Sequence, residues 1–250
     1  MSKQPKGFVI YRGPSLLDGS PIVAIAITNS TNAKTGNMVQ TYILRADMLP
    51  TEAVRTGADG AICGSGEFGC KHRPFVGGAC YVNVGQGPQS VYRAFLRGNY
   101  PDDDGYMVQT ACSGRMVRLG TYGDPAAVPV EVWERILRNA AGRTGYTHQW
   151  ARIEGTDEGA RLLGLVMASV DNESEAEQAR ALGLRYFRIR TAEQTVGKGE
   201  FVCPASEEAG KRKLCATCGA CDGTDRAGKA SPVIIVHGSK KNRFIPIALI

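Results

Sequence analysis

Apolar residues in the first sixty positions fall in short continuous runs rather than at helical spacing. Residues 22–28 (IVAIAIT) and 39–45 (VQTYILR) are rich in β-branched and aromatic side chains, and a polar, turn-forming connection separates them. Two such runs joined by a turn-rich segment predict a β-hairpin. We therefore expect an N-terminal β region over residues 1–60, with a short helix near its end at 50–58 (PTEAVRTGA).

From about residue 115 the pattern changes to an alternation of short apolar runs and helical periodicity. Asn172 followed by Glu175 forms a capping box, which predicts that a helix begins there. Strands that alternate with helices indicate parallel pairing through crossover connections. The strands predicted after residue 80 are 81–84, the first part of 116–124 (which ends in a loop), 144–150, 161–170, 184–190 and 233–238. One predicted helix begins near Gln89, and two others cover 128–140 and 171–183.

These elements predict an α/β fold: a partial (β/α) barrel-like parallel sheet with an N-terminal β-hairpin region and cysteine-rich loops. A single domain over 1–250 would comprise the N-terminal β region, a first cysteine segment, a β/α repeat region, and a second cysteine segment with a C-terminal strand. The boundaries of these four segments are 1–60, 61–114, 115–200 and 201–250.

Polar residues follow several of the predicted strands. The carboxyl ends of parallel strands meet at one rim, where α/β proteins place their working groups. The hypothetical pocket residues on this rim are Asp124, His148, Gln149 and Arg190.

Composition narrows the class of protein. The start, MSKQPKGFVIYRG, lacks the apolar stretch of a secretory signal, and no run approaches the roughly 18 apolar residues of a membrane span. We therefore expect a protein of the reducing cytoplasm without membrane contact, where clustered cysteines bind metal more often than they form disulfides. The net charge of +6 permits contact with nucleic acid or an anionic ligand without requiring either.

The cysteines carry the strongest chemical signal. Three thiols at C-x2-C-x2-C spacing, Cys215, Cys218 and Cys221, suit three irons of a cubane, and Cys203, which precedes a proline, is the expected fourth ligand. Zinc bound by the same four thiols is the alternative, although structural zinc is usually held by two separate pairs. A pair of disulfides is the third option.

A second group, Cys63, Cys70 and Cys80, has spacings that match no standard motif. Three cysteines could hold a cluster with one iron open to a ligand. Alternatively, Cys112 or His72 completes the set and gives a closed cluster or a zinc site.

The segments ICG…CKHRP…CYVNV, RLGTYGDPAAVP, GYTHQW, MASVD…ALGLRYFRIR and FVCPAS…CATCGAC resemble a family of largely uncharacterised bacteriophage proteins. The strand and loop pattern also resembles a shortened radical-SAM barrel. That resemblance implies [4Fe–4S] clusters, S-adenosylmethionine as a ligand and, for a phage protein, the host cell cytoplasm. The radical-SAM spacing C-x3-C-x2-C does not occur in this chain.

Three functions remain open at this point. The first is an iron–sulfur protein with two [4Fe–4S] clusters, acting as a radical-SAM-like redox enzyme on a small-molecule substrate with an electron donor. The second is a non-enzymatic module, stabilised by iron–sulfur or zinc, that binds nucleic acid or a host protein. The third is electron transfer without a substrate.

Overall fold

One open β-sheet runs through the protein. The computed structural model describes residues 5–30, 33–103, 105–224 and 229–246. Nine strands pair in the order β1-β2-β3-β4-β5-β6-β7-β9-β8. Their bounds are β1 Gly7–Pro14, β2 Pro21–Ile27, β3 Val39–Arg45, β4 Met116–Tyr122, β5 Gly142–Thr147, β6 Met167–Val170, β7 Tyr186–Arg190, β8 Glu200–Val202 and β9 Ser231–Ile235.

The direction of pairing changes once along this sheet. Strands β1, β2 and β3 are antiparallel, which confirms the predicted hairpin and adds β1 to it. Every later pairing, from β3–β4 to β8–β9, is parallel. Strands β1 and β8 form the two edges and do not pair with each other, so the predicted partial barrel-like α/β fold is confirmed.

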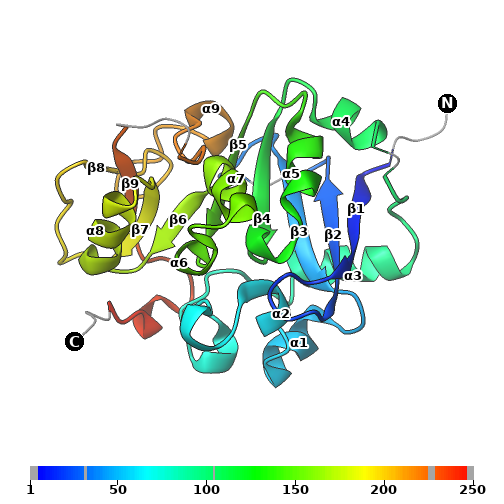
Figure 1. Ribbon diagram of the computed structural model, residues 1–250, viewed down its shortest axis with the longest axis horizontal. Coiled ribbons are helices and arrows are strands. Elements are labelled where there is room, and N and C mark those ends of the chain that lie inside the picture. The colour runs from blue at the N-terminus through cyan, green and yellow to red at the C-terminus, as the bar shows by residue number, and fades with distance from the viewer. Residues whose placement is uncertain (1–4, 31–32, 104, 225–228, 247–250) are drawn as a thin grey trace.

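Helices cover one face of the parallel strands. Figure 1 shows α5, α6 and α7 in front of β4, β5 and β6, with α8 beside β7. Trp133 and Ile136 of α5 are fully buried in the main core, together with Leu162 of α7 and Val117 of β4. The helix bounds are α1 Pro50–Thr56, α2 Gly60–Cys63, α3 Gly87–Leu96, α4 Met107–Cys112, α5 Val130–Leu137, α6 Trp150–Ile153, α7 Asp157–Leu165, α8 Glu173–Ala181 and α9 Cys215–Cys218.

A cavity lies against the other face of the parallel strands. Side chains alternate between the two faces of a strand. In β4, Val117 and Leu119 are buried in the helix-covered core, whereas Arg118 and Tyr122 line the cavity. Strand order and alternation therefore determine which residues of each strand reach the site.

Two predicted strands are corrected. Residues 161–165 belong to α7, which begins where the Thr156 hydroxyl accepts a hydrogen bond from the Gly159 N–H, and only Met167–Val170 forms a strand. A short apolar run does not by itself distinguish a buried helix from a strand. Residues 81–84 are irregular and belong to no strand of the sheet. The predicted cap of α8 is confirmed, because the Asn172 side chain accepts from the Glu175 N–H.

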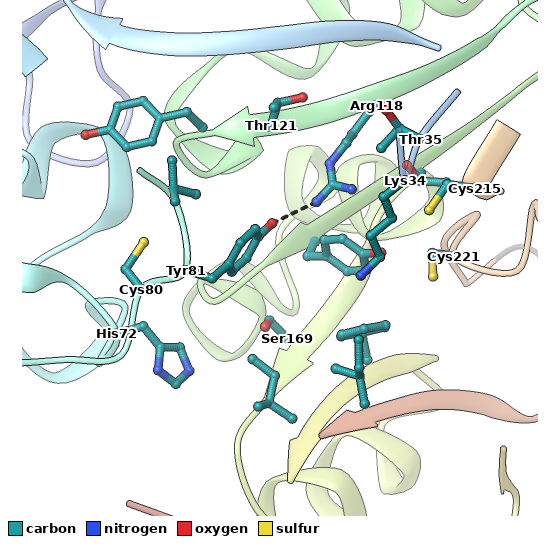
Figure 2. A pocket seen from close by; sticks show the side chains of 18 of the residues that line it. Lys34, Thr35, His72, Cys80, Tyr81, Arg118, Thr121, Ser169, Cys215 and Cys221 are labelled. Carbon is teal, nitrogen blue, oxygen red and sulfur yellow. Dashed lines mark hydrogen bonds between the residues drawn. The ribbon is translucent and has the colours of Figure 1, made fainter. Parts of the chain in front are cut away.

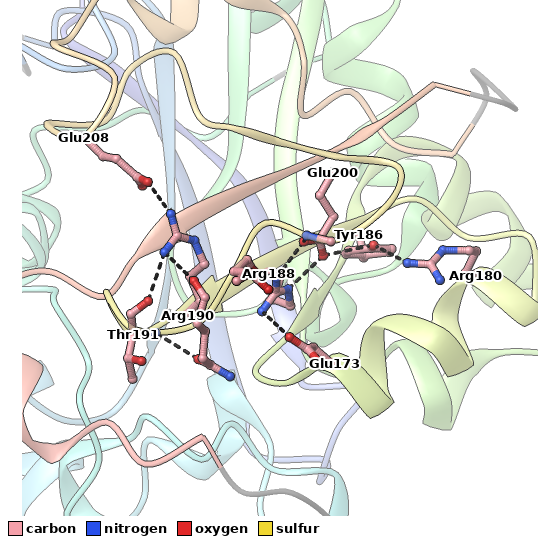
Figure 3. A network of polar contacts seen from close by, with 11 residues as sticks. Glu173, Arg180, Tyr186, Arg188, Arg190, Thr191, Glu200 and Glu208 are labelled. Carbon is pink, nitrogen blue, oxygen red and sulfur yellow. Dashed lines mark hydrogen bonds and ion pairs between the residues drawn. The ribbon is translucent and has the colours of Figure 1, made fainter.

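A buried polar network joins β7 to β8 across β9 (Figure 3). The Arg188 guanidinium donates to both carboxylate oxygens of Glu200, at 2.8 and 2.6 Å, and both side chains are almost fully buried. Arg190 lies on the same face and contacts Glu208 and the carbonyl oxygens of Thr191 and Gln194. These contacts fix the edge of the sheet from which Cys203 follows.

Among the residues that the structure describes, every helix is too short or too polar to span a bilayer.

Candidate metal-binding cavity

A cavity of about 580 Å³ lies against the face of the parallel strands that carries no helices. Seven cysteines line it, and they come from two distant segments of the chain. We name them the N-terminal set (Cys63, Cys70 and Cys80) and the C-terminal set (Cys203, Cys215, Cys218 and Cys221). Figure 2 shows Cys80 on one side of the cavity and Cys215 and Cys221 on the other.

The N-terminal set is gathered by tight loops between α2 and α3. The Cys70 N–H donates to the Cys63 carbonyl at 3.0 Å, and the Cys80 N–H donates to the His72 carbonyl at 2.8 Å. Gly64 has φ +77°, and a Cβ at this position would lie 2.4 Å from Gln149 Nε2. A glycine is thus required for the chain to turn past Gln149 directly after Cys63.

The C-terminal set surrounds the other end of the cavity. Cys203 directly follows β8, and its N–H donates to the Val233 carbonyl of β9 at 2.8 Å. Cys215 and Cys218 are the first and last residues of α9, which places their side chains one turn apart. The carbonyl of Cys221 accepts from the Gly145 N–H of β5. Strands β9 and β5 therefore hold two separate parts of this set, at Cys203 and Cys221.

Polar groups beside several of the sulfurs favour the thiolate. The N–H groups of His72, Val82 and Ala205, each two residues after a cysteine, act to lower the pKa of Cys70, Cys80 and Cys203. The Tyr146 hydroxyl acts to lower the pKa of Cys221. Donors aimed at sulfur stabilise a thiolate, and such bonds are part of how proteins tune metal-bound sulfur.

Burial opposes the charged form of the same thiols. It raises the pKa of Cys70 and of Cys80 to about 11, and that of Cys221 to about 12. Burial also raises the pKa of Cys63 well above its usual value, and the nearby Cys70 and Cys80 raise it further. At neutral pH these thiols are therefore protonated, and a metal centre that bound them would have to displace their protons.

The spacing of the sulfurs bears on which metal fits. All eight cysteines lie in the described part of the chain and are free thiols, so no disulfide joins them. No three of their sulfurs lie within 4.8 Å of one another. Four thiolates bound to one zinc ion at about 2.3 Å would lie about 3.8 Å apart. In a cubane each thiolate binds a different iron, so the sulfurs stand farther apart than around one zinc ion, but the eight cysteines show no cluster-like grouping of either kind.

Arg118 lies between the two cysteine sets, beside Tyr81 (Figure 2). Its guanidinium donates to the Tyr81 hydroxyl at 2.9 Å and stands 5.6 Å from the centre of the Tyr146 ring. Burial acts to lower its pKa, but the anionic forms of nearby groups, Cys215 and Cys221 among them, outweigh burial and raise it. Within the described residues Arg118 has no carboxylate partner, and its Nε has no hydrogen-bond acceptor. Sequence patterns did not identify this cation, because its role depends on the face of β4 to which it belongs.

Two of the four hypothetical pocket residues line the cavity. Asp124 accepts hydrogen bonds from the N–H groups of Ala126 and His148, and burial raises its pKa. His148 Nε2 lies 3.9 Å from the Cys70 sulfur. Gln149 is buried behind the wall and donates to the Phe68 carbonyl at 2.7 Å, so it supports the loop of the N-terminal set. Arg190 is held in the network behind β7 and does not line the cavity.

The two residues considered as a fourth ligand of the N-terminal set are placed differently. Cys112 is fully buried in the hydrophobic core and lies outside the cavity lining. His72 lines the cavity, but its Nε2 lies 2.8 Å from Asp171 Oδ1 and its ring stacks on Phe244. The N-terminal set therefore offers three thiols, with His72 turned toward Asp171.

Comparison of the chain with protein-family models, with curated proteins and with solved structures gives no match.

Proposed function

We propose that this chain is an iron–sulfur redox protein that holds one [4Fe–4S] cluster on each cysteine set. The observation that carries the proposal is the convergence of two cysteine sets, more than a hundred residues apart in sequence, on one cavity. The C-x2-C-x2-C spacing within the C-terminal set suits a cubane, whereas structural zinc is usually held by two separate pairs.

The two sets would have different roles. The C-terminal set offers four thiols, which complete the coordination of a cubane, so its cluster would relay electrons. The N-terminal set offers three, which leaves one iron open toward the cavity. The open position and a cavity of about 580 Å³ favour a redox enzyme that acts on a small molecule over a module that binds nucleic acid at its surface. S-adenosylmethionine is the ligand that the radical-SAM resemblance suggests.

Arg118 fits this proposal as a counter-charge. A cluster with four thiolate ligands is an anion, and it would supply the negative charge that the described carboxylates do not give Arg118. A nearby cation stabilises the reduced, more negative cluster and therefore raises its reduction potential. We infer that Arg118 tunes the cluster of the C-terminal set.

Replacement of Arg118 by glutamine tests this role. Arg118→Gln is expected to lower the reduction potential of one cluster by on the order of tens of millivolts, because a charge is lost from a partly buried position. The measurement is an anaerobic redox titration followed by visible absorption and by the EPR signals of the reduced clusters.

Arg118→Lys and Arg12→Gln are the matched controls. Lysine retains the charge at position 118 and should retain most of the potential, whereas Arg12 lies on β1 in an exposed pair with Asp102 and should not affect it. An unchanged or raised potential in Arg118→Gln would contradict the counter-charge role. Absence of any reducible chromophore in the unmodified protein would contradict the iron–sulfur proposal itself.

A further inference from the structure

A second kind of metal site lies beside the N-terminal set. His72, His148 and Asp171 come from the loop after Cys70, the end of β5 and the end of β6. Their ligand atoms all lie within 4.8 Å of one another, and within the described residues no other trio of histidine, cysteine or acidic side chains does so. The two imidazole rings meet edge to face, with centres 5.6 Å apart.

The three side chains of this trio lie in the wall of the cavity, and each is buried or partly buried. The side chain of Asp171 is 6% exposed and that of His72 is 12% exposed. Both histidines line the cavity, so ligand positions opposite the protein would open into it. Hydrogen bonds also hold the backbone at Asp171 and His148. The Asp171 N–H donates to the Glu175 carboxylate, and the His148 N–H donates to the Asp124 carboxylate, each at 2.8 Å. Outer-shell contacts of this kind orient metal ligands.

The donor set differs in chemistry from the cysteine sets. Two neutral imidazoles and one carboxylate supply a single negative charge, which suits a divalent ion. Two histidines with one carboxylate are the ligands of non-haem iron sites and of catalytic zinc sites, and both keep positions open for water or substrate. Thiolates, in contrast, are the softer ligands of clusters.

We infer that His72, His148 and Asp171 bind one divalent transition-metal ion, of the zinc or iron(II) class, with its open positions facing the cavity. Without the ion, the contact between His72 and Asp171 is a hydrogen bond. With it, His72 Nε2 carries no proton, a neutral His72 ring holds its proton on Nδ1 instead, and both atoms become ligands. The inference does not rest on the iron–sulfur proposal, because none of its ligands is a cysteine.

Zinc content after equilibrium dialysis tests the site, with zinc as the probe. Asp171→Asn preserves size and removes the charge, and His148→Gln removes a second ligand. Each variant is expected to hold one zinc ion fewer per chain than the unmodified protein, or to bind that ion at least about tenfold more weakly, since even outer-shell changes cost 10- to 100-fold. Near-ultraviolet circular dichroism checks that each variant is folded, and zinc should raise the melting temperature of the unmodified protein more than that of either variant.

His237→Gln is the matched control. His237 lines the same cavity but stacks on Tyr81, outside the trio, so its replacement should leave the zinc count unchanged. Equal zinc in the unmodified protein, Asp171→Asn and His148→Gln would overturn the inference, as would an equal loss in His237→Gln. Cys218→Ser should retain this zinc ion even if it loses iron, so failure of the trio site and failure of the iron–sulfur proposal are distinguishable.

Discussion

Replacing Cys218 and Cys221 together with serine is expected to remove about four irons and four sulfides per chain, which is the content of one cubane. Both residues belong to the C-terminal set and line the cavity. Replacing Cys63 and Cys70 should remove an equal amount from the other end of the cavity. Iron and acid-labile sulfide, measured on anaerobically purified protein, give the result directly.

Cys112→Ala is the control for both double variants. Cys112 is fully buried in the core and does not line the cavity, so its replacement should leave the iron content intact. If either double variant kept all its iron, the corresponding cysteine set would not be a cluster site. If Cys112→Ala lost as much iron as the double variants, the assignment of ligands from the cavity would be wrong.

Arg188→Met is expected to cost about 3–5 kcal/mol of unfolding free energy, because it leaves the Glu200 carboxylate buried without a counter-charge. Glu200 also accepts hydrogen bonds from the Tyr186 hydroxyl and the Gly197 N–H, so it is held in place after the change. Denaturant unfolding followed by circular dichroism measures the loss. The double variant Arg188→Met with Glu200→Leu should recover most of it, since removal of both charges avoids the unpaired one.

An exposed arginine gives the contrast. Arg161 contacts Glu131 and Glu134 on the surface with 44% of its side chain exposed, and Arg161→Met should cost far less unfolding free energy than Arg188→Met. Similar losses in Arg188→Met and Arg161→Met would show that the network behind β7 does not carry the stability that its burial implies.

Local patterns predicted much of the fold. The hairpin of β2 and β3, the parallel strands β4, β5 and β7, and the Asn172 cap all follow from runs, periodicity and capping that lie within a few residues. The apolar run at 161–170 was predicted to be a strand, but its first half is the end of helix α7. A short apolar run alone does not distinguish a buried helix from a strand. Nothing local reveals that β9 inserts between β7 and β8, which is a long-range pairing.

The candidate site, like the fold, could be predicted from the sequence only in part. Sequence spacing identified Cys215, Cys218 and Cys221 through the local signal C-x2-C-x2-C, whereas the other four cavity cysteines follow no standard spacing. It did not reveal that both sets face one cavity, that Arg118 lies between them, or that Asp171 joins His72 and His148. Arg190 illustrates the limit: it ends a strand as predicted, but alternation directs Ile189 to the cavity and Arg190 to the opposite face.

Iron, acid-labile sulfide and zinc per chain, measured together on anaerobically purified protein, test the central claim most directly. About eight irons and eight sulfides with a coloured solution are expected, in agreement with two cubanes on the two cysteine sets. Up to one zinc ion in addition would agree with the trio of His72, His148 and Asp171. A colourless protein that contains zinc in place of iron, with no sulfide, would contradict the iron–sulfur account.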